Sequence, residues 1–271
     1  MAHAALSLRY KKRGTHLEYY YKLWSEWMVS GQDLPFWQEA FVKFYQAFIE
    51  ADRWKQYLQG VGTTVMITIM ALGIGIVLGV MMAMVRTTHD QQRPGTKKPL
   101  LSILNTICKT YITIIRGTPM MVQLLIMSMV IFSSSRNYTM VGALTLGLNS
   151  GAYVAEIIRG GLMALDPGQM EAGRSLGLGY WDTMRFVVIP QAFKSVLPAL
   201  GNEFIVLLKD TSLINVIGGK ELVHAAQGII TRTYEQMYPL LGVAVIYLIL
   251  VMFLTKLLNI LERRLLQGDR H

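Results

Sequence analysis

The chain has 271 residues, of which 52% are hydrophobic and only 16% are charged. Ordinary soluble domains carry about 25% charged residues, so the composition argues against a soluble fold and indicates a membrane protein. The net charge of +9 would suit a protein that binds nucleic acid. Because long apolar runs indicate a membrane protein, the positive charge is better explained by anionic lipid headgroups and by basic cytoplasmic loops. We therefore expect no nucleic-acid partner. The single cysteine, Cys108, excludes an internal disulfide framework and a zinc site made of cysteines alone.

Residues 1–57 are expected to form an N-terminal extension, made of a basic tail followed by an interfacial amphipathic helix. Charged side chains such as Lys22 and Glu26 forbid a membrane span here. Apolar side chains recur at helical spacing further on, at Phe36, Ala40, Phe44, Ala47 and Phe48. Aromatic rings are favourable where lipid meets water, so we expect this helix to lie in the membrane interface. A cytosolic helical hairpin is the alternative.

Residues 58–265 are expected to form an all-α integral membrane domain with about five transmembrane helices, followed by a C-terminal cytoplasmic tail at 266–271. About 20 apolar residues are needed to cross the hydrocarbon of a bilayer. The mainly apolar runs that meet or approach this length predict spans at 61–85, 119–135, 139–165, 191–208 and 237–255, and the first and last of these contain no charged residue. The sequence Gly117-Thr118-Pro119 predicts a break before the second span. Residues 209–236 are expected to lie outside, with a short helix at 219–231.

The loop at 86–98 gives the strongest signal for orientation in the membrane. It contains one acidic residue, Asp90, and four basic residues: Arg86, Arg93, Lys97 and Lys98. Short loops rich in Lys and Arg remain on the cytoplasmic side, so this loop is expected inside the cell. The prediction that follows has the N-terminus outside and the C-terminus in the cytoplasm.

Two glycine pairs predict close helix packing inside the membrane. Gly75 and Gly79 are four residues apart in the first span, and Gly147 and Gly151 are four apart in the third. Residues four apart share one helix face, and a face without Cβ atoms lets another helix approach.

Residues 166–190 lie between two apolar segments, yet they are polar, charged and interrupted by glycine. Asp166 followed by Pro167 predicts a helix start with a side-chain cap. Gly177 is expected to end this short helix, and Asp182 is expected to cap a second one. The segment is therefore predicted to be a helix–turn–helix at the membrane surface.

The same segment carries the pattern E-A-G-x3-G-x9-V-x-I-P from Glu171 to Pro190. It resembles the E-A-A-x3-G-x9-I-x-L-P signature of bacterial ABC-importer permeases, and departs from it by small or apolar exchanges at Gly173, Val187 and Ile189. Four longer strings are similar to the polar amino-acid subfamily, the histidine-, glutamine- and arginine-type permeases: IRGTPMMVQLL, LNSGAYVAEIIRGG, GQMEAGRSLGL and LPALGNEFIVLLKDTSL. The resemblance covers about residues 58–265 and leaves the extension out.

This resemblance implies a permease subunit of an ATP-driven importer in the bacterial cytoplasmic (inner) membrane. Its implied partners are a cytoplasmic ABC ATPase dimer, a second permease subunit of the same or a sister kind, and an extracellular or periplasmic solute-binding protein. The coupling contacts with the ATPase are implied for Glu171, Ala172, Gly173 and Gly177. The chain has no G-x-x-x-x-G-K-[ST] loop, so we expect no enzyme activity, cofactor or metal in it, with Mg-ATP bound by the partner ATPase.

Polar and ionisable residues inside predicted spans are candidate site residues, because they are expensive in lipid. The substrate-binding candidates are Thr118, Asn149, Tyr153, Asn202 and Glu203. A broken helix can bind a carboxylate through free backbone N–H groups, and Glu203 is suited to an ammonium group. The alternative for each asparagine is a hydrogen bond between helices. Glu156 has Arg159 on the next turn, so an ion pair is as good an interpretation as a site role.

Two alternatives remain open from the sequence, one within the same class of function and one outside it. A permease for another small solute, such as methionine, an osmolyte or a metal chelate, would share most of these features. A channel or a membrane scaffold is the more distant alternative. A channel should show a pore-lining repeat, and a scaffold has no need of ionisable groups inside the bundle.

Overall fold

The computed structural model describes residues 16–92, 98–166 and 168–267. The regular structure of these residues is entirely helical, in agreement with the predicted all-α fold. The described residues fall into two compact units, one made of residues 16–59 with 225–245 and the other of the described residues of 60–224 with 246–267.

In the first unit, residues 16–48 of the extension form a helical hairpin, the shape of the alternative interpretation, and its second helix covers the segment predicted to be amphipathic. Helix α2 (His16–Val29) and helix α3 (Phe36–Phe48) are separated by a turn in which Gly31 has a φ of 76°. The rings of Tyr21 and Tyr45 stack with their centroids 4.3 Å apart. Both rings are buried, so an aromatic core of its own holds the hairpin together.

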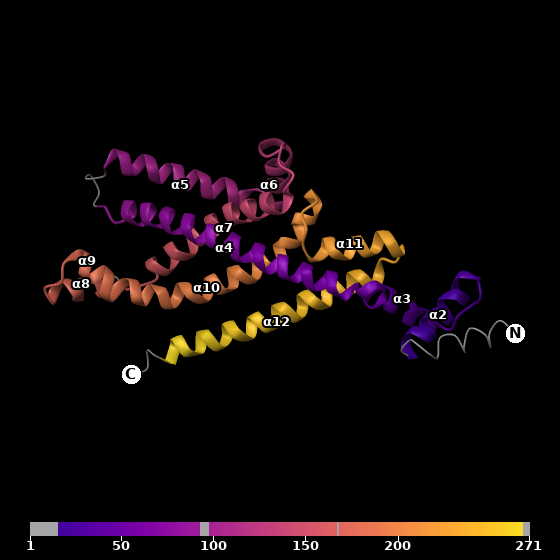
Figure 1. The fold of residues 1–271 in the computed structure, drawn as a ribbon. Helices are drawn as coiled ribbons and strands as arrows, with labels where there is room; N and C mark the ends of the chain where they lie inside the picture. The colour runs from indigo at the N-terminus through magenta and orange to yellow at the C-terminus, as the bar shows by residue number, and fades with distance from the viewer. Residues whose placement is uncertain (1–15, 93–97, 167, 268–271) are drawn as a thin grey trace. The chain divides into compact units, whose positions relative to one another are not determined.

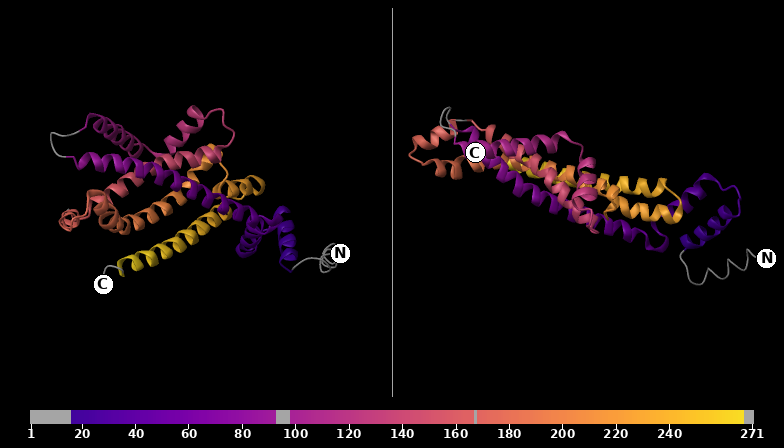
Figure 2. Two further views of the ribbon diagram at one scale, coloured as in Figure 1. Left: turned by 60° about the vertical axis from the view of Figure 1, so that its left-hand side comes forward. Right: turned by 90° about the horizontal axis from the view of Figure 1, so that it is seen from above.

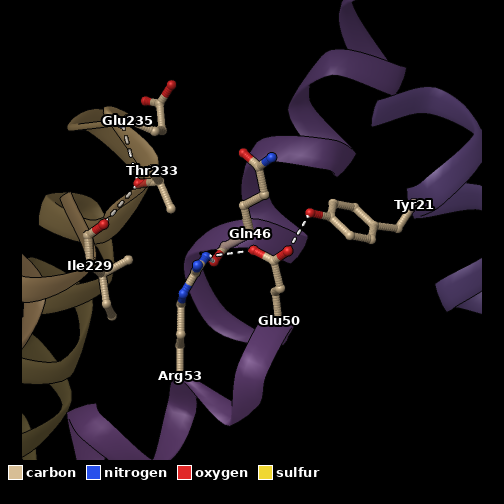
Figure 3. Close-up of polar contacts among 7 residues, drawn as sticks. All are labelled: Tyr21, Gln46, Glu50, Arg53, Ile229, Thr233 and Glu235. Atoms are coloured by element: carbon tan, nitrogen blue, oxygen red, sulfur yellow. Dashed lines mark hydrogen bonds and ion pairs between the residues drawn. The ribbon is translucent and has the colours of Figure 1, made fainter. Parts of the chain in front are cut away.

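A second set of contacts joins the hairpin to the start of helix α4 (Trp54–Asp90). The Tyr21 hydroxyl donates to Glu50 Oε1 at 2.8 Å, and Arg53 forms an ion pair with Glu50 at 2.9 Å (Figure 3). Arg53 also donates to the carbonyl of Gln46. The short 3-10 turn at Glu50–Asp52 is therefore tied to both helices of the hairpin.

The hairpin also packs on later residues of the same unit. Helix α11 (Leu222–Thr233) is followed after three residues by helix α12 (Met237–Gln267). Lys43 lies 3.4 Å from Glu235 in this connection. A Cβ atom on Gly242 would lie 2.5 Å from the ring of Phe48, so the ring packs where only glycine leaves room.

In the second unit, α5 (Pro99–Gly117) runs beside the second half of α4, as Figures 1 and 2 show, with Asn105 Nδ2 3.2 Å from His89 Nδ1. The chain then breaks at residues 117–119 and continues as α6 (Met120–Ile126) and a π-helical turn, η2 (Met127–Ile131). The two parts are bent by 106°. The part after the break is about 18 Å long at 1.5 Å per residue, against about 30 Å of hydrocarbon. The predicted span at 119–135 is therefore too short to cross alone.

Among the described residues, three helices are long and apolar enough to cross a membrane, at Glu50–Asp90, Tyr138–Met163 and Met237–Leu265. The bent pair of α5 with α6–η2 makes a fourth if it is counted as one span. Helix α10 (Ile189–Asp210), which was predicted as a further span, does not belong to this group. It contains Lys194, Glu203 and an internal proline, so a fifth crossing remains a prediction.

Helix α7 (Tyr138–Met163) packs closely against α4 along a seam of glycines. A Cβ on Gly79 would lie 2.5 Å from Val154 Cγ1, and a Cβ on Gly147 would lie 2.7 Å from Ile74 Cβ. Comparable contacts pair Gly75 with Ser150 and Gly151 with Leu78. The glycine pair of α4 thus faces α7, and the glycine pair of α7 faces α4. This arrangement lets the two backbones approach closely.

Candidate functional site

A polar network surrounds the break between α5 and α6, and Gln123 lies at its centre. The Gln123 side-chain amide donates to the Ile115 carbonyl at 2.7 Å and to Thr118 Oγ1 at 2.8 Å. The Thr118 hydroxyl donates to the Ile114 carbonyl at 2.9 Å. From α7, Asn149 Nδ2 donates to Gln123 Oε1 at 3.0 Å. The end of α5, the start of α6 and the middle of α7 therefore meet around one side chain.

An exposed cation lies next to this network. The guanidinium carbon of Arg116, in the last turn of α5, is 5.2 Å from the ring centroid of Tyr153 on α7. Both side chains are partly open to their surroundings. A cation held over an aromatic face keeps its N–H donors available to an anionic group.

A buried carboxylate lies on the adjacent side of α7. Glu203 of α10 is buried, and the Ser150 hydroxyl donates to its Oε1 at 2.8 Å. Ser150 directly follows Asn149, so the network and the carboxylate meet within one turn of α7. Asn202, the neighbour of Glu203, is exposed on α10.

Three of the five predicted substrate-binding residues, Thr118, Asn149 and Tyr153, are thus brought together at the break. Glu203 contacts Ser150, the residue that follows Asn149 on α7. Asn202 makes no hydrogen bond to α7 among the described residues. The sequence interpretation missed the three residues that make the connections: Arg116, Gln123 and Ser150. Gln123 is a polar residue inside a predicted span, so the reasoning applied to Asn149 would have found it.

Glu156, two turns beyond Asn149, forms ion pairs on both sides. It pairs with Arg86 of α4, and its Oε2 lies 3.0 Å from Arg159 Nη2. The ion-pair interpretation therefore describes Glu156 in this structure, with Arg86 as an additional partner from the predicted cytoplasmic loop.

The segment at 166–190 forms helix α8 (Gly168–Ser175), helix α9 (Tyr180–Thr183) and a π-helical turn, η3 (Met184–Val188). Asp166 Oδ1 accepts the Gly168 N–H at 2.8 Å, in agreement with the predicted cap. Gly177 has a φ of 84°, and its N–H donates to the Arg174 carbonyl at 3.0 Å. This left-handed glycine ends α8 as predicted. The predicted Asp182 cap is wrong, because the N-cap of α9 is Gly179 and Asp182 lies inside the first turn.

The four predicted coupling residues differ in exposure. Glu171, Ala172 and Gly177 are exposed, but Gly173 is buried. A Cβ on Gly173 would lie 2.5 Å from Thr183 Cγ2. Gly173 therefore packs α8 against α9 instead of facing outward, and an ATPase contact remains a prediction for the other three.

Two large apolar side chains on the same segment face outward. Leu176 is 83% exposed and Trp181 is 80% exposed. Both side chains are therefore free, within this chain, to contact another molecule. The sequence interpretation did not single them out, although a tryptophan in so polar a segment is a visible signal.

Membrane-length helices, polar groups at a broken helix and a polar segment of short helices together define a membrane transport component. Residues 100–267 match the family described as binding-protein-dependent transport system inner membrane component. The match covers more than half of the chain, which therefore belongs to this family. The chain is thus a multi-pass inner-membrane transport component, and the resemblance to ABC-importer permeases is confirmed.

Several relatives and solved structures are similar to most of the chain. The glutamine transport system permease protein GlnP of Escherichia coli K12 is 36% identical over 212 residues, which cover 77% of this chain and 92% of that protein. The putative GlnP of Rickettsia bellii is 33% identical, with the same coverage. A crystal structure of an amino acid ABC transporter with histidines has a TM-score of 0.69 at 39% identity, covering 78% of this chain and 94% of that one. An inward-facing MetNI methionine ABC transporter, with a TM-score of 0.66 and 18% identity, shares the fold.

Proposed function

We propose that the chain is the permease subunit of an ATP-driven importer that moves a polar amino acid across the membrane by alternating access. The observation that carries this proposal is the network of Thr118, Gln123 and Asn149 at the break in a membrane-spanning segment. It places hydrogen-bonding groups of two helices at a point where helix ends leave backbone groups free. The named substrates of the similar proteins support an amino acid as the solute.

The solute would meet groups of both charge signs. Its carboxylate would be attracted to the broken helix, where Thr118 and the Arg116 guanidinium lie. Its ammonium, or a cationic side chain, would be attracted to Glu203. Asn149 and Tyr153 from α7, with Asn202 from α10, would complete the polar lining.

The energy would come from partner subunits, because the sequence contains no nucleotide-binding loop. A cytoplasmic ABC ATPase dimer would bind Mg-ATP and contact α8 and α9 through Glu171, Ala172 and Gly177. Leu176 and Trp181 are exposed beside these residues and would add apolar contacts. Gly173 would hold α8 against α9, so that the two short helices move together. A second permease subunit and a solute-binding protein on the outer face would complete the importer.

In the orientation that we propose, the N-terminus lies outside and the C-terminus lies in the cytoplasm. The basic loop at 86–98 supports this orientation. The extension would then lie where the outer face of the cytoplasmic membrane meets water. Phe36, Trp37 and Phe44 are exposed on α3, and Trp54 is exposed where the chain continues into the first span. Exposed aromatic rings at the end of a span favour an interfacial position.

Uptake into proteoliposomes tests this function. The vesicles would carry this chain with its ATPase, with ATP inside and the binding protein outside, and would be offered a panel of labelled amino acids. ATP-dependent accumulation of one chemical group of amino acids is the expected result. If the ATPase bound stably but no amino acid accumulated, the assignment as an importer permease would stand and the assignment of an amino acid as the solute would be rejected. Failure of the ATPase to bind would reject the assignment of α8 and α9 as the coupling contact.

A further inference from the structure

A narrow apolar groove runs along α4 on the side that faces α9 and the first half of α10. Ile76, Val80 and Met84 form its wall on α4, where residues four apart share one helix face. Ala192 and Val196 form its wall on α10. The groove has a volume of about 420 Å³, and none of the candidate substrate-binding residues lines it. It is therefore separate from the candidate site at the break between α5 and α6.

One end of the groove is polar. Thr87 lines this end and is only 5% exposed, and its hydroxyl has no hydrogen-bond partner among the described residues. Gln91, one turn further along α4, accepts a hydrogen bond of 2.8 Å from the Tyr180 hydroxyl and so joins the end of α4 to α9. A buried hydroxyl without a partner costs free energy. Thr87 is therefore a donor that an acceptor on a ligand in the groove would satisfy.

The groove opens sideways onto the surface of a membrane-spanning helix. Met84 of α4 and Phe193 of α10 both line it, and both are more than half exposed. Helix α4 belongs to a candidate span whose most apolar stretch is only 28% buried within the chain. The groove is thus continuous with the apolar surface that α4 presents to the membrane, and a lipid chain can enter it without leaving the hydrocarbon.

The dimensions of the groove suit a single hydrocarbon chain. From Ile76 to Gln91 it follows about 22 Å of α4 at 1.5 Å per residue, so its mean cross-section is about 20 Å². A helix is about 10 Å across and has a cross-section roughly four times larger, so a helix of a second subunit does not fit inside it. The distance along α4 from Thr87 to Ile76 is about 16 Å, close to half of the roughly 30 Å of bilayer hydrocarbon. A lipid of one leaflet would therefore place its ester group at Thr87 and the end of its chain near Ile76.

We propose that the groove binds one acyl chain of a membrane phospholipid, whose ester carbonyl accepts a hydrogen bond from Thr87. In the proposed orientation this lipid belongs to the cytoplasmic leaflet. The bound chain fills the space between α4, which packs on α7 along the glycine seam, and the connection from α9 into α10. It therefore transmits movements of α8 and α9 to α4 and α7. This effect on transport rests on the proposed function, whereas the binding of the chain rests on the groove alone.

Photolabelling of the full chain tests the binding of the acyl chain without any solute or ATPase. The protein would be placed in nanodiscs of phosphatidylethanolamine and phosphatidylglycerol that contain a small fraction of phosphatidylethanolamine with a diazirine in one acyl chain. Mass spectrometry would locate the labelled residues. Label is expected on Ala192 and Val196, which are buried, so that only a chain inside the groove reaches them.

Two variants of α4 provide a matched comparison. Val80→Trp places a ring in the groove and should lower the labelling of Ala192 and Val196 several-fold. Val77→Trp makes the same change less than one turn away, at an exposed position outside the groove, and should leave it unchanged. Absence of label at the two residues of α10, which is the result expected if a second permease subunit covers the groove, would overturn the proposal. Equal labelling in the two variants would overturn it as well.

Thr87→Val tests where the ester group lies. It keeps the shape of the side chain and removes the hydroxyl, so the labelling of the groove should fall several-fold. Thr110→Val, at an exposed position of α5, is the control and should behave like wild type. Unchanged labelling in Thr87→Val would refute the hydrogen bond to the lipid ester.

Uptake tests the effect on transport, in proteoliposomes whose phospholipids have either unbranched or methyl-branched chains. Branched chains are too wide for the groove, so wild-type uptake per ATP hydrolysed should fall several-fold in them. Val80→Trp fills the groove with its own ring and should respond less to the branching than Val77→Trp. Equal responses of the two variants would show that the groove does not act on transport. Absence of wild-type uptake in both lipids would instead refute the proposed function, and photolabelling would still decide whether the groove binds a chain.

Discussion

The Ser150 hydroxyl donates a hydrogen bond of 2.8 Å to Glu203 Oε1 and joins α7 to α10 inside the bundle. The absence of a side chain on Gly75 of α4 makes room for this hydroxyl, because a Cβ there would lie 2.7 Å from Ser150 Oγ. Three helices therefore depend on one another at a buried carboxyl group. Such a group serves either to bind a cation or to hold the helices together.

Separate substitutions of Ser150 and Glu203 distinguish these two roles. Glu203→Gln keeps the size of the side chain and removes the charge, so it should change the profile of solutes taken up while the ATPase still binds. Ser150→Ala leaves the carboxyl group without this donor and should lower stability by about 1–3 kcal/mol. Thermal unfolding in detergent and competition with unlabelled amino acids would measure the two effects. A wild-type solute profile for Glu203→Gln would leave Glu203 with a structural role.

Gln123 should be essential to the geometry of the break. Gln123→Leu replaces the amide with an apolar side chain of similar size. The Ile115 carbonyl and the Asn149 amide then lose their hydrogen bonds to Gln123. Loss of these bonds should cost about 1–3 kcal/mol and reduce uptake roughly tenfold or more. Initial rates of uptake over a range of solute concentrations would measure the loss. Gln227→Leu, at an exposed position of α11, serves as the control. A Gln123→Leu protein with normal uptake would remove the network from the candidate site.

The contact of Gly173 with Thr183 predicts a defect in coupling without direct contact to the ATPase. In Gly173→Ala the new Cβ would collide with Thr183, which should cost about 1–3 kcal/mol or push α8 away from α9. ATP hydrolysis should continue while uptake per ATP falls, and Thr183→Ala in the same chain should restore it. Gly160→Ala is the matched control, since a Cβ there meets nothing within 4 Å. If Gly173→Ala behaves like Gly160→Ala in both assays, the packing argument fails.

The stability of the chain should depend on pH through Glu221, which is only 2% exposed and accepts the Val223 and His224 N–H groups at the start of α11. Burial raises the pKa of this group to about 7 in the folded chain, above its ordinary value of 4.5. The folded state therefore binds the proton more tightly, and its stabilising contribution is complete below pH 4.5 and is lost as pH rises through about 7. The loss should amount to roughly 3 kcal/mol at most. Melting temperatures between pH 5 and pH 8 should fall more steeply for wild type than for Glu221→Gln, and parallel curves would contradict the prediction.

The attachment of the N-terminal hairpin to α12 should depend on Gly242. In Gly242→Ala a Cβ would lie 2.5 Å from the ring of Phe48, so the hairpin should detach more readily. Limited proteolysis should then cleave faster in the turn at 30–35. Gly228→Ala, on α11 in the same unit, adds a methyl group in open space and should leave the cleavage rate unchanged. Equal cleavage rates for the two variants would show that the contact is unimportant.

Features set by neighbouring residues were predicted best from the sequence. The cap at Asp166 and the left-handed turn at Gly177 depend on local backbone chemistry, and both are present in the structure. The cap assigned to Asp182 failed because Gly179 is the N-cap of α9, which places Asp182 inside the first turn. The choice between two neighbouring cap positions depends on how the whole segment packs.

Features set by the rotation of one helix against another were predicted in part. Polar residues such as Asn149 were found as candidates, but the sequence does not say that Gln123 is the partner or that Ser150 meets Glu203. These pairings need the 106° bend after α5 and the close approach of α4 to α7. A glycine pair predicts that a helix has a close neighbour and leaves open which helix it is.

The glycine seam between α4 and α7 limits how this bundle can change shape. Side chains of each helix occupy the space beside the glycines of the other helix. If α4 slid or twisted against α7, these side chains would collide with the backbone of the other helix. The two helices should therefore travel as a single rigid body through every conformation. Hinges are then expected elsewhere, at the 106° bend between α5 and α6 and in the π-helical turn that leads into α10.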